Sequence, residues 1–153
     1  MITLGPLEQE VRRYLIERAT QADPEHPLDA RITYGELCQA VDPEEAQWRG
    51  PRYRGIGETL GHISAYEVDH GQPMLSALVV RHQTRRVGDG FIPLARSLGR
   101  KVPEGEEEAF WLREVQEVVR FWGQPNPLPR VIAMLDTVIS EVAEIKRLLG
   151  HAT

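Results

Sequence analysis

Apolar side chains near the start of the chain recur at the spacing of one helix face. Val11, Leu15 and Ala19 belong to this stripe, and Pro6 stands where a helix accepts proline, in its first turn. The pattern therefore predicts a helix over residues 6–20. The ten residues that follow contain two prolines and several carboxylates, so we expect a loop there.

A capped helix is predicted to begin at Tyr34. The Thr33 hydroxyl is placed to accept a hydrogen bond from the Glu36 amide, while the Glu36 side chain can reach back to the Thr33 amide. This reciprocal pair fixes the first residue of a helix.

A second helix is expected to open at Arg54. Ile56, Leu60 and Ile63 fall on one side of it at helical spacing. Gly71 should end it by adopting a left-handed conformation. The two helices have the order of a helix-turn-helix, in which the start of the second helix meets DNA.

A strand is predicted next, because residues 74–81 form a short run rich in Leu and Val. Residues 83–90 hold a Gly-Asp-Gly sequence that suits a hairpin turn and would form a wing. We therefore expect an α+β protein with a winged helix-turn-helix core. Its expected divisions are an N-terminal helix and loop (1–30), the winged-helix domain (31–100) and a C-terminal helical hairpin (101–153).

The C-terminal third carries two helical patterns. A charged linker over residues 101–107 precedes an apolar helix that Gly123 closes. After a proline-rich break, apolar residues recur at alternating steps of three and four, the heptad pattern of a coiled coil. They are Leu128, Val131, Leu135, Val138, Val142, Ile145 and Leu149. Two interpretations fit this run: self-association, with the last five as candidate oligomerisation residues, or a terminal helix packed on the domain's own core.

Charge is distributed unevenly along the chain. The net formal charge is −5, but residues 1–48 carry −6, residues 49–101 carry +5 and residues 102–153 carry −4. The basic excess coincides with the helix-turn-helix pattern, as an electrostatic footprint for phosphate requires. A solvated surface without a ligand is the alternative interpretation.

Cysteine content and the lengths of the apolar runs indicate the cellular compartment that the protein is expected to occupy. Cys38 is the only cysteine, so neither an intramolecular disulfide nor a multi-cysteine zinc site can form. No apolar run approaches the roughly 18 residues that a membrane-spanning helix needs, and the N-terminus lacks the pattern of a signal peptide. We expect a cytoplasmic protein without a membrane partner.

Four segments carry a resemblance to a known family. ITYGEL, RGIGETLG, LSALVV and VGDGF begin at residues 32, 54, 75 and 87. Their order resembles the winged-helix domain of the O6-alkylguanine DNA alkyltransferases and alkyltransferase-like proteins. The last two segments are also similar to small domains associated with HNH-type restriction endonucleases.

The alkyltransferase resemblance implies roles for two residues. In that family a tyrosine crowds a DNA phosphate, and an arginine that opens the recognition helix fills the gap left by a flipped base; these would be Tyr34 and Arg54. The family's Pro-Cys-His-Arg element is replaced here by Pro73-Met74-Leu75-Ser76. Alkyl transfer is therefore not implied.

Basic and aromatic side chains of this region are the candidate DNA contacts, because arginine neutralises phosphate and aromatic rings stack on bases. They are Tyr34, Arg49, Arg52, Tyr53, Arg54, Arg81, Arg85 and Arg86. Aromatic residues of the connection, Trp48 among them, could instead be buried anchors.

No catalytic residue, metal site or cofactor is expected. Glu67 and Asp69 stand two residues apart, so they do not face each other on a helix. His62 and His70 lack the spacing of metal ligands, and Ser76 lies in an apolar run without a nucleophile elbow.

The expected function is non-enzymatic DNA binding in bacterial DNA repair, restriction or defence, directed at distorted or modified DNA or exerted beside a nuclease partner. The rival interpretation is a protein-interaction module that uses the heptad helix to form a homo-oligomer on a winged-helix scaffold. An enzyme ranks third.

Overall fold

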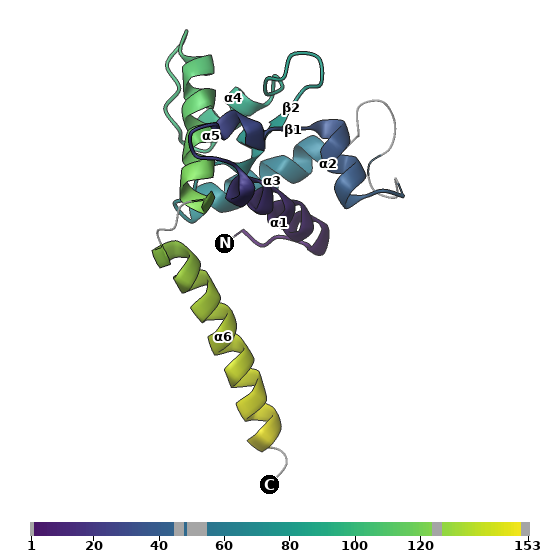
Figure 1. The fold of residues 1–153 in the computed structure, drawn as a ribbon, viewed down its shortest axis with the longest axis vertical. Helices are drawn as coiled ribbons and strands as arrows, with labels where there is room; N and C mark the ends of the chain where they lie inside the picture. Colours follow the sequence, from purple (N-terminus) through teal and green to yellow (C-terminus); the bar gives the residue numbers. More distant parts are fainter. Residues whose placement is uncertain (1, 45–47, 49–54, 124–126, 151–153) are drawn as a thin grey trace. The chain divides into compact units, whose positions relative to one another are not determined.

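The computed structural model describes residues 2–44, 48, 55–123 and 127–150. The chain divides into two units, residues 1–123 and residues 124–153, and each is described by itself. Unit 1 contains α1 (Pro6–Gln21), η1 (Pro27–Ala30), β1 (Ile32–Thr33), α2 (Tyr34–Val41), α3 (Ile56–Asp69), η2 (Leu75–Leu78), β2 (Val79–Val80), α4 (Phe91–Ser97) and α5 (Glu107–Gly123). Unit 2 contains α6 (Pro127–Gly150) (Figure 1). The described residues are thus mostly helical with one small sheet, a composition compatible with the α+β class.

Local capping signals set the start of α2 and the end of α3 as the sequence predicts, whereas α3 begins at Ile56, after a left-handed Gly55, and not at the expected residue 54. The Thr33 hydroxyl accepts a hydrogen bond from the Glu36 amide at 3.1 Å, and α2 begins at Tyr34. Gly71 has a φ of 69°, and the Gln72 amide donates to the Glu67 carbonyl at 2.8 Å. This is the Schellman arrangement that closes a helix. The predicted helix over residues 6–20 is confirmed as α1.

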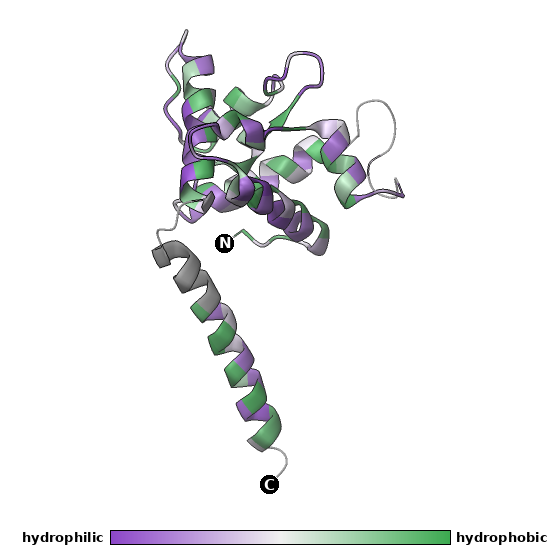
Figure 2. Ribbon diagram, viewed as in Figure 1, coloured by the Kyte–Doolittle hydropathy of each residue, from purple (hydrophilic) through white to green (hydrophobic). Residues whose placement is uncertain are grey.

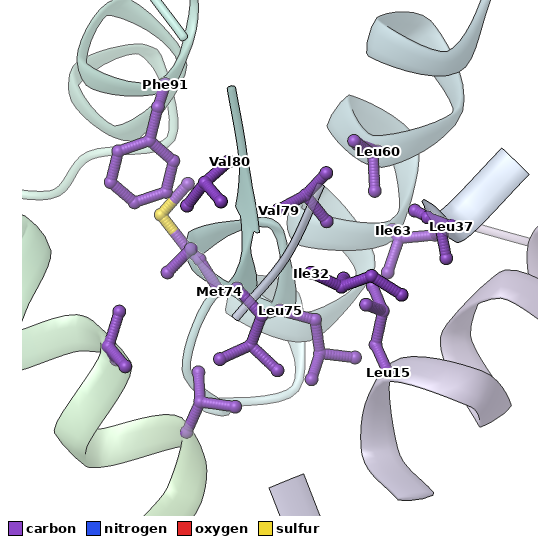
Figure 3. Close-up of a cluster of buried hydrophobic side chains, with 14 of the residues drawn as sticks. Leu15, Ile32, Leu37, Leu60, Ile63, Met74, Leu75, Val79, Val80 and Phe91 are labelled. Atoms are coloured by element: carbon purple, nitrogen blue, oxygen red, sulfur yellow. The ribbon is translucent and has the colours of Figure 1, made fainter. Parts of the chain in front are cut away.

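The centre of unit 1 is the segment of residues 74–80, which η2 and β2 form. Every side chain of this segment is buried, and it packs against α1, α3 and α5. Met74, Leu75, Val79 and Val80 lie among Leu15, Ile32, Leu37, Leu60, Ile63 and Phe91 (Figure 3). The core is therefore built around a non-helical segment that helices enclose.

The sheet that this segment forms is very short. Ile32 pairs with Val79 and Thr33 pairs with Val80, in parallel. Parallel strands need covered faces, and the neighbouring helices supply that cover. Two residue pairs satisfy few backbone groups, so the rest of the segment needs other partners.

Side chains of α5 and α3 supply those partners. The Met74 amide donates to Glu114 Oε2 at 2.9 Å, and Trp111 Nε1 donates to the Ala77 carbonyl at 2.9 Å. The Ser76 amide donates to Ser64 Oγ at 3.3 Å, and the two serine hydroxyls lie 2.6 Å apart. The buried backbone is thus satisfied by side chains where a longer sheet would use another strand.

Glu114 also holds the Arg100 guanidinium in a two-pronged contact. Arg100 Nη1 and Nη2 lie 2.5 and 2.8 Å from the two carboxylate oxygens. The Glu114 hydrogen bond is the main reason why the pKa of Arg100 is raised above its ordinary value. The buried carboxylate therefore ties the loop after α4 to α5 and to the central segment.

The predicted winged helix is not present in the residues that the structure describes. Residues 75–78 of the expected strand form a 3₁₀ turn, and only Val79 and Val80 extend. The expected hairpin over residues 83–90 leads into α4 instead of into an antiparallel strand. A short apolar run has no periodicity that separates a buried strand from a buried turn, which explains the error.

The unit boundary also lies elsewhere than expected. α5 packs against α1 and buries Trp111, Val115 and Val118 within unit 1, which extends to Gly123. The apolar face of α5 requires this core, because it has residues to bury along its whole length. The expected division at residue 101 therefore separates residues that fold together, and a hairpin between α5 and α6 stays a prediction.

Loss of the Glu114 carboxylate should destabilise unit 1 strongly. We expect Glu114→Ala to lower the free energy of unfolding by about 3 kcal/mol, because it orphans a buried amide and unpairs Arg100. Urea unfolding followed by tryptophan fluorescence measures the change. Glu117→Ala, on an exposed position of the same helix, should change it by less than about 0.5 kcal/mol. Equal losses in the two variants would refute the role given to Glu114.

Candidate functional site

The first candidate surface is one face of α6. Seven large apolar side chains on this helix are 44–64% exposed: Leu135, Val138, Ile139, Val142, Ile145, Leu148 and Leu149. Figure 2 shows apolar residues recurring along α6 beside polar ones. Leu135, Val138, Val142, Ile145 and Leu149 keep the alternating steps of four and three that the sequence predicts for a coiled-coil seam.

The opposite side of α6 is polar or small. It carries Asp136, Ser140, Ala143, Glu144 and Arg147, all exposed. Arg147 and Glu144 form an ion pair one turn apart on this side. The helix is therefore amphipathic, and its apolar side is large enough to mark an interaction surface.

The second candidate surface surrounds the loop of residues 81–90, between β2 and α4. Tyr34, at the first position of α2, packs its ring against the core and places its hydroxyl beside Gly88. A Cβ at Gly88 would lie 3.1 Å from the Tyr34 oxygen and 3.6 Å from Arg81 Nε. Burial raises the pKa of Tyr34, although the Gly88 amide and the Arg81 charge oppose the rise. Tyr34 thus holds this loop against α2.

Two arginines of this loop are already paired with carboxylates. Arg81 Nη2 lies 3.1 Å from Asp89 Oδ2, and Arg86 Nη2 lies 3.0 Å from Glu108 Oε1. Both pairs are exposed, so each contributes little stability and can exchange its carboxylate for another anion. Arg85 is exposed and has a positive φ of 58°, which turns the chain sharply at the tip of the loop.

Arg31 adds a further guanidinium to this surface. Its Nη1 donates to the Arg85 carbonyl at 2.9 Å, and its Nε donates to the Leu28 carbonyl at 2.8 Å. Arg31 is not among the residues predicted from the sequence, because its contact joins residues 54 positions apart. The structure thus gathers four arginines with Tyr34, while Asp89 and Glu108 offset part of the positive charge.

The other candidate DNA contacts, Arg49, Arg52, Tyr53 and Arg54, lie outside the described residues. Their assigned roles stay predictions. Trp48 is buried, and its amide donates to Asp42 Oδ2 at 3.1 Å. This position supports the anchoring interpretation of that tryptophan over base stacking.

The third candidate is a groove of about 490 Å³ beside α1, whose lining includes Arg12, Arg13 and Tyr66. Arg12 forms an ion pair with the fully buried Glu67. Its guanidinium also lies 5.1 Å from the Tyr66 ring centroid and 5.5 Å from that of Trp122. Because Arg12 is held from several sides, it joins α1 to α3 and α5 and is not free to bind a ligand.

The acidic and histidine residues considered in the sequence do not converge on one site. Burial raises the pKa of Glu67 although Arg12 opposes the rise. His70 stacks on Tyr66 with 4.1 Å between centroids, and His62 Nδ1 lies 2.8 Å from Glu8 Oε2. Each of these side chains thus has a structural partner of its own.

Cys38 is buried in α2. Burial and, to a smaller degree, the nearby Asp42 carboxylate raise the pKa of its thiol to about 11. A thiol in this state is neither a ready nucleophile nor a metal ligand. Among the residues that the structure describes, no group of three His, Cys, Asp or Glu side chains could hold a metal ion.

No helix within the described ranges is both long and apolar enough to cross a membrane.

Comparison of the chain with protein-family models, with curated proteins and with solved structures gave no match. The candidate surfaces are therefore judged on their own geometry.

The Tyr34 hydroxyl should stabilise the loop of residues 81–90 in a pH-dependent manner. We expect Tyr34→Phe to lower the free energy of unfolding by about 1 kcal/mol at pH 7, because the Gly88 amide loses its acceptor. Burial disfavours the Tyr34 phenolate and so raises the folded pKa of this residue, although the Gly88 hydrogen bond opposes the rise. Wild-type stability is therefore unaffected by Tyr34 ionisation below about pH 10, the unfolded pKa, and decreases as the pH rises through the folded value.

Urea unfolding between pH 7 and pH 11 tests this expectation, with Tyr14→Phe as a matched control for loss of one phenol. The Tyr34→Phe variant should lose less stability than wild type over the alkaline range. The same alkaline loss in both proteins would show that Tyr34 does not contribute to it.

Proposed function

We propose that this protein is a non-enzymatic assembly module in which α6 joins copies of the chain and each copy carries unit 1 as its functional domain. One observation carries the proposal: seven large apolar side chains of α6 are about half exposed or more. Full burial of one such side chain is favourable by about 1.5–3 kcal/mol, so seven of them form a strong driving force for association.

The length and composition of α6 support the same proposal. An isolated helix is marginally stable in water even when its residues favour helix, and most helical stability in proteins comes from packing of an amphipathic face. The 24 residues of α6 span about 36 Å, long enough for three heptads. A second copy of the same helix supplies a face of matching length and spacing. Packing of α6 on its own unit 1 is the competing arrangement.

Charges placed on the apolar face should abolish self-association. We expect Leu135→Asp with Val142→Asp to convert an oligomer to a monomer, because the interface would bury four or more carboxylates without partners. Multi-angle light scattering at several concentrations measures the mass. Ser140→Asp with Ala143→Asp adds the same charge to the polar side and should leave the mass unchanged.

Two results would overturn the proposal. A wild-type protein that is monomeric at tens of micromolar would mean that α6 packs within its own chain. Equal dissociation by the two double variants would mean that charge, and not the apolar face, controls association.

DNA is the second candidate partner, favoured by the arginines that gather around the loop of residues 81–90. Arg31, Arg81, Arg85 and Arg86 lie on or beside this loop, and arginines neutralise phosphates whatever the base sequence. Assembly through α6 would present several such loops together and increase the affinity for a long polyanion. Recognition of distorted DNA, or action beside a nuclease, remains an expectation from the resemblance around Tyr34 and Arg54.

Removal of the loop charges should flatten the salt dependence of DNA binding. Each phosphate contact contributes about 0.9 to the slope of log K against log salt, so Arg85→Ala with Arg86→Ala should reduce the slope by about 2. Fluorescence anisotropy between 50 and 300 mM salt, roughly the range over which such contacts weaken, measures it. The exposed pair Arg113→Ala with Arg120→Ala is the charge-matched control. An equal decrease in both variants would assign the effect to net charge alone.

A further inference from the structure

The apolar face of α6 is broader than a two-stranded seam requires. Leu135, Val142 and Leu149 occupy the first position of successive heptads, and Val138 and Ile145 occupy the fourth. These are the a and d positions of a coiled coil. Ile139 and Leu148 stand on either side of them, at e and g, and are 64% and 60% exposed. The stripe therefore extends over four heptad positions.

This breadth bears on the number of chains. In a two-stranded coiled coil the e and g positions border water, so Ile139 and Leu148 would stay largely exposed. A bundle with more strands covers them. Leucine at a with isoleucine at d also favours three or four strands over two. In α6 Leu135 and Leu149 at a and Ile145 at d follow this pattern, whereas Val142 at a departs from it.

Two charged residues at the edges of the stripe bear on the orientation of the chains. Glu141 occupies a g position and Lys146 the e position of the next heptad, five residues later. Within one helix, side chains five apart do not face each other, whereas those three and four apart do. Neither residue forms an ion pair in the part of the chain that the structure describes.

Between parallel helices in register, the g position of one chain lies beside the following e position of its neighbour. Glu141 of each copy would then lie beside Lys146 of the next copy, and the pair repeats around the bundle. Antiparallel helices pair g with g and e with e. Glu141 would then meet another Glu141 or an apolar side chain, and Lys146 would do likewise.

We infer that α6 assembles with copies of itself as a parallel, in-register bundle of three or four chains, in which Glu141 of each copy pairs with Lys146 of its neighbour. This inference rests on the proposed assembly through α6 and adds its direction, register and number of chains. The charged residues on the outer side, Glu144 and Arg147, pair within their own helix and leave the bundle surface polar.

Charge reversal in the full-length protein tests the arrangement. Glu141→Lys alone places lysine beside lysine, and Lys146→Glu alone places glutamate beside glutamate. Each should lower the association constant by on the order of tenfold, since several modest ion pairs become repulsions. The double variant Glu141→Lys/Lys146→Glu should recover wild-type association. An equimolar mixture of the two single variants should also associate, because each supplies the charge that the other lacks.

Sedimentation velocity and equilibrium give both the mass and the association constant. Asp136→Lys, which makes the same change of charge outside the stripe, is the matched control and should associate like wild type. Association at three or four chains with recovery in the double variant supports the inference. A stable dimer overturns the number of chains.

Indifference of a stable oligomer to both single reversals overturns the parallel arrangement but leaves assembly through α6 intact. A monomeric wild type overturns the proposed assembly itself, and this inference with it. Circular dichroism of each variant shows whether α6 stays helical, so a loss of association through unfolding is distinguished from a loss through repulsion.

Discussion

The structure of unit 1 depends on hydrogen-bond partners for the backbone N–H and C=O groups of a buried segment, because very little of that segment pairs in a sheet. Residues 74–80 are apolar and enclosed, yet only Val79 and Val80 pair with another strand. The remaining polar groups rely on a 3₁₀ turn and on side chains of two helices. Glu114 and Trp111 extend from α5 and Ser64 from α3. Because an unsatisfied buried amide costs free energy comparable to a lost hydrogen bond, the positions of these helices are coupled to the segment that they cover.

This coupling explains which parts of the fold can be read from the sequence. Helix ends with local signals, such as Thr33 before α2 and Gly71 after α3, are determined by residues within a few positions, and these predictions are confirmed. The turn within residues 74–80 is decided by partners such as Glu114, which lies 40 positions away from Met74. No periodicity within the segment indicates them. The predicted strand over residues 74–81 was wrong for this reason. The apolar face of α5 was assigned to the wrong part of the chain because its partner α1 lies at the opposite end of the sequence of unit 1.

The candidate surfaces divide in the same way. The apolar stripe on α6 lies within one helix, so the heptad pattern of the sequence predicts it. The structure shows in addition that the side chains of this stripe are exposed. The surface around the loop of residues 81–90 is formed by contacts between residues that are distant in the sequence. Tyr34 and Arg81 were predicted as parts of a binding surface, whereas Arg31 was not. The ion pair between Arg12 and Glu67 joins residues 55 positions apart. The sequence shows only an apolar stripe on α1 and a carboxylate on the inner side of α3, and neither pattern indicates that these two residues pair. Sequence patterns identify the side chains that a single helix or loop can present. The contacts between elements decide which of those side chains are used within the fold and which stay exposed.

The burial of Cys38 has a practical chemical consequence. Burial raises the pKa of this thiol to about 11, so it stays protonated at neutral pH, and the folded chain shields the sulfur from reagents. We therefore expect Cys38 of the folded protein to react slowly with mild oxidants and maleimides. A thiol-reactive label should therefore modify a cysteine introduced at an exposed position and leave Cys38 unmodified. A fluorophore can thus be attached to α6 or to the loop of residues 81–90 without replacing Cys38.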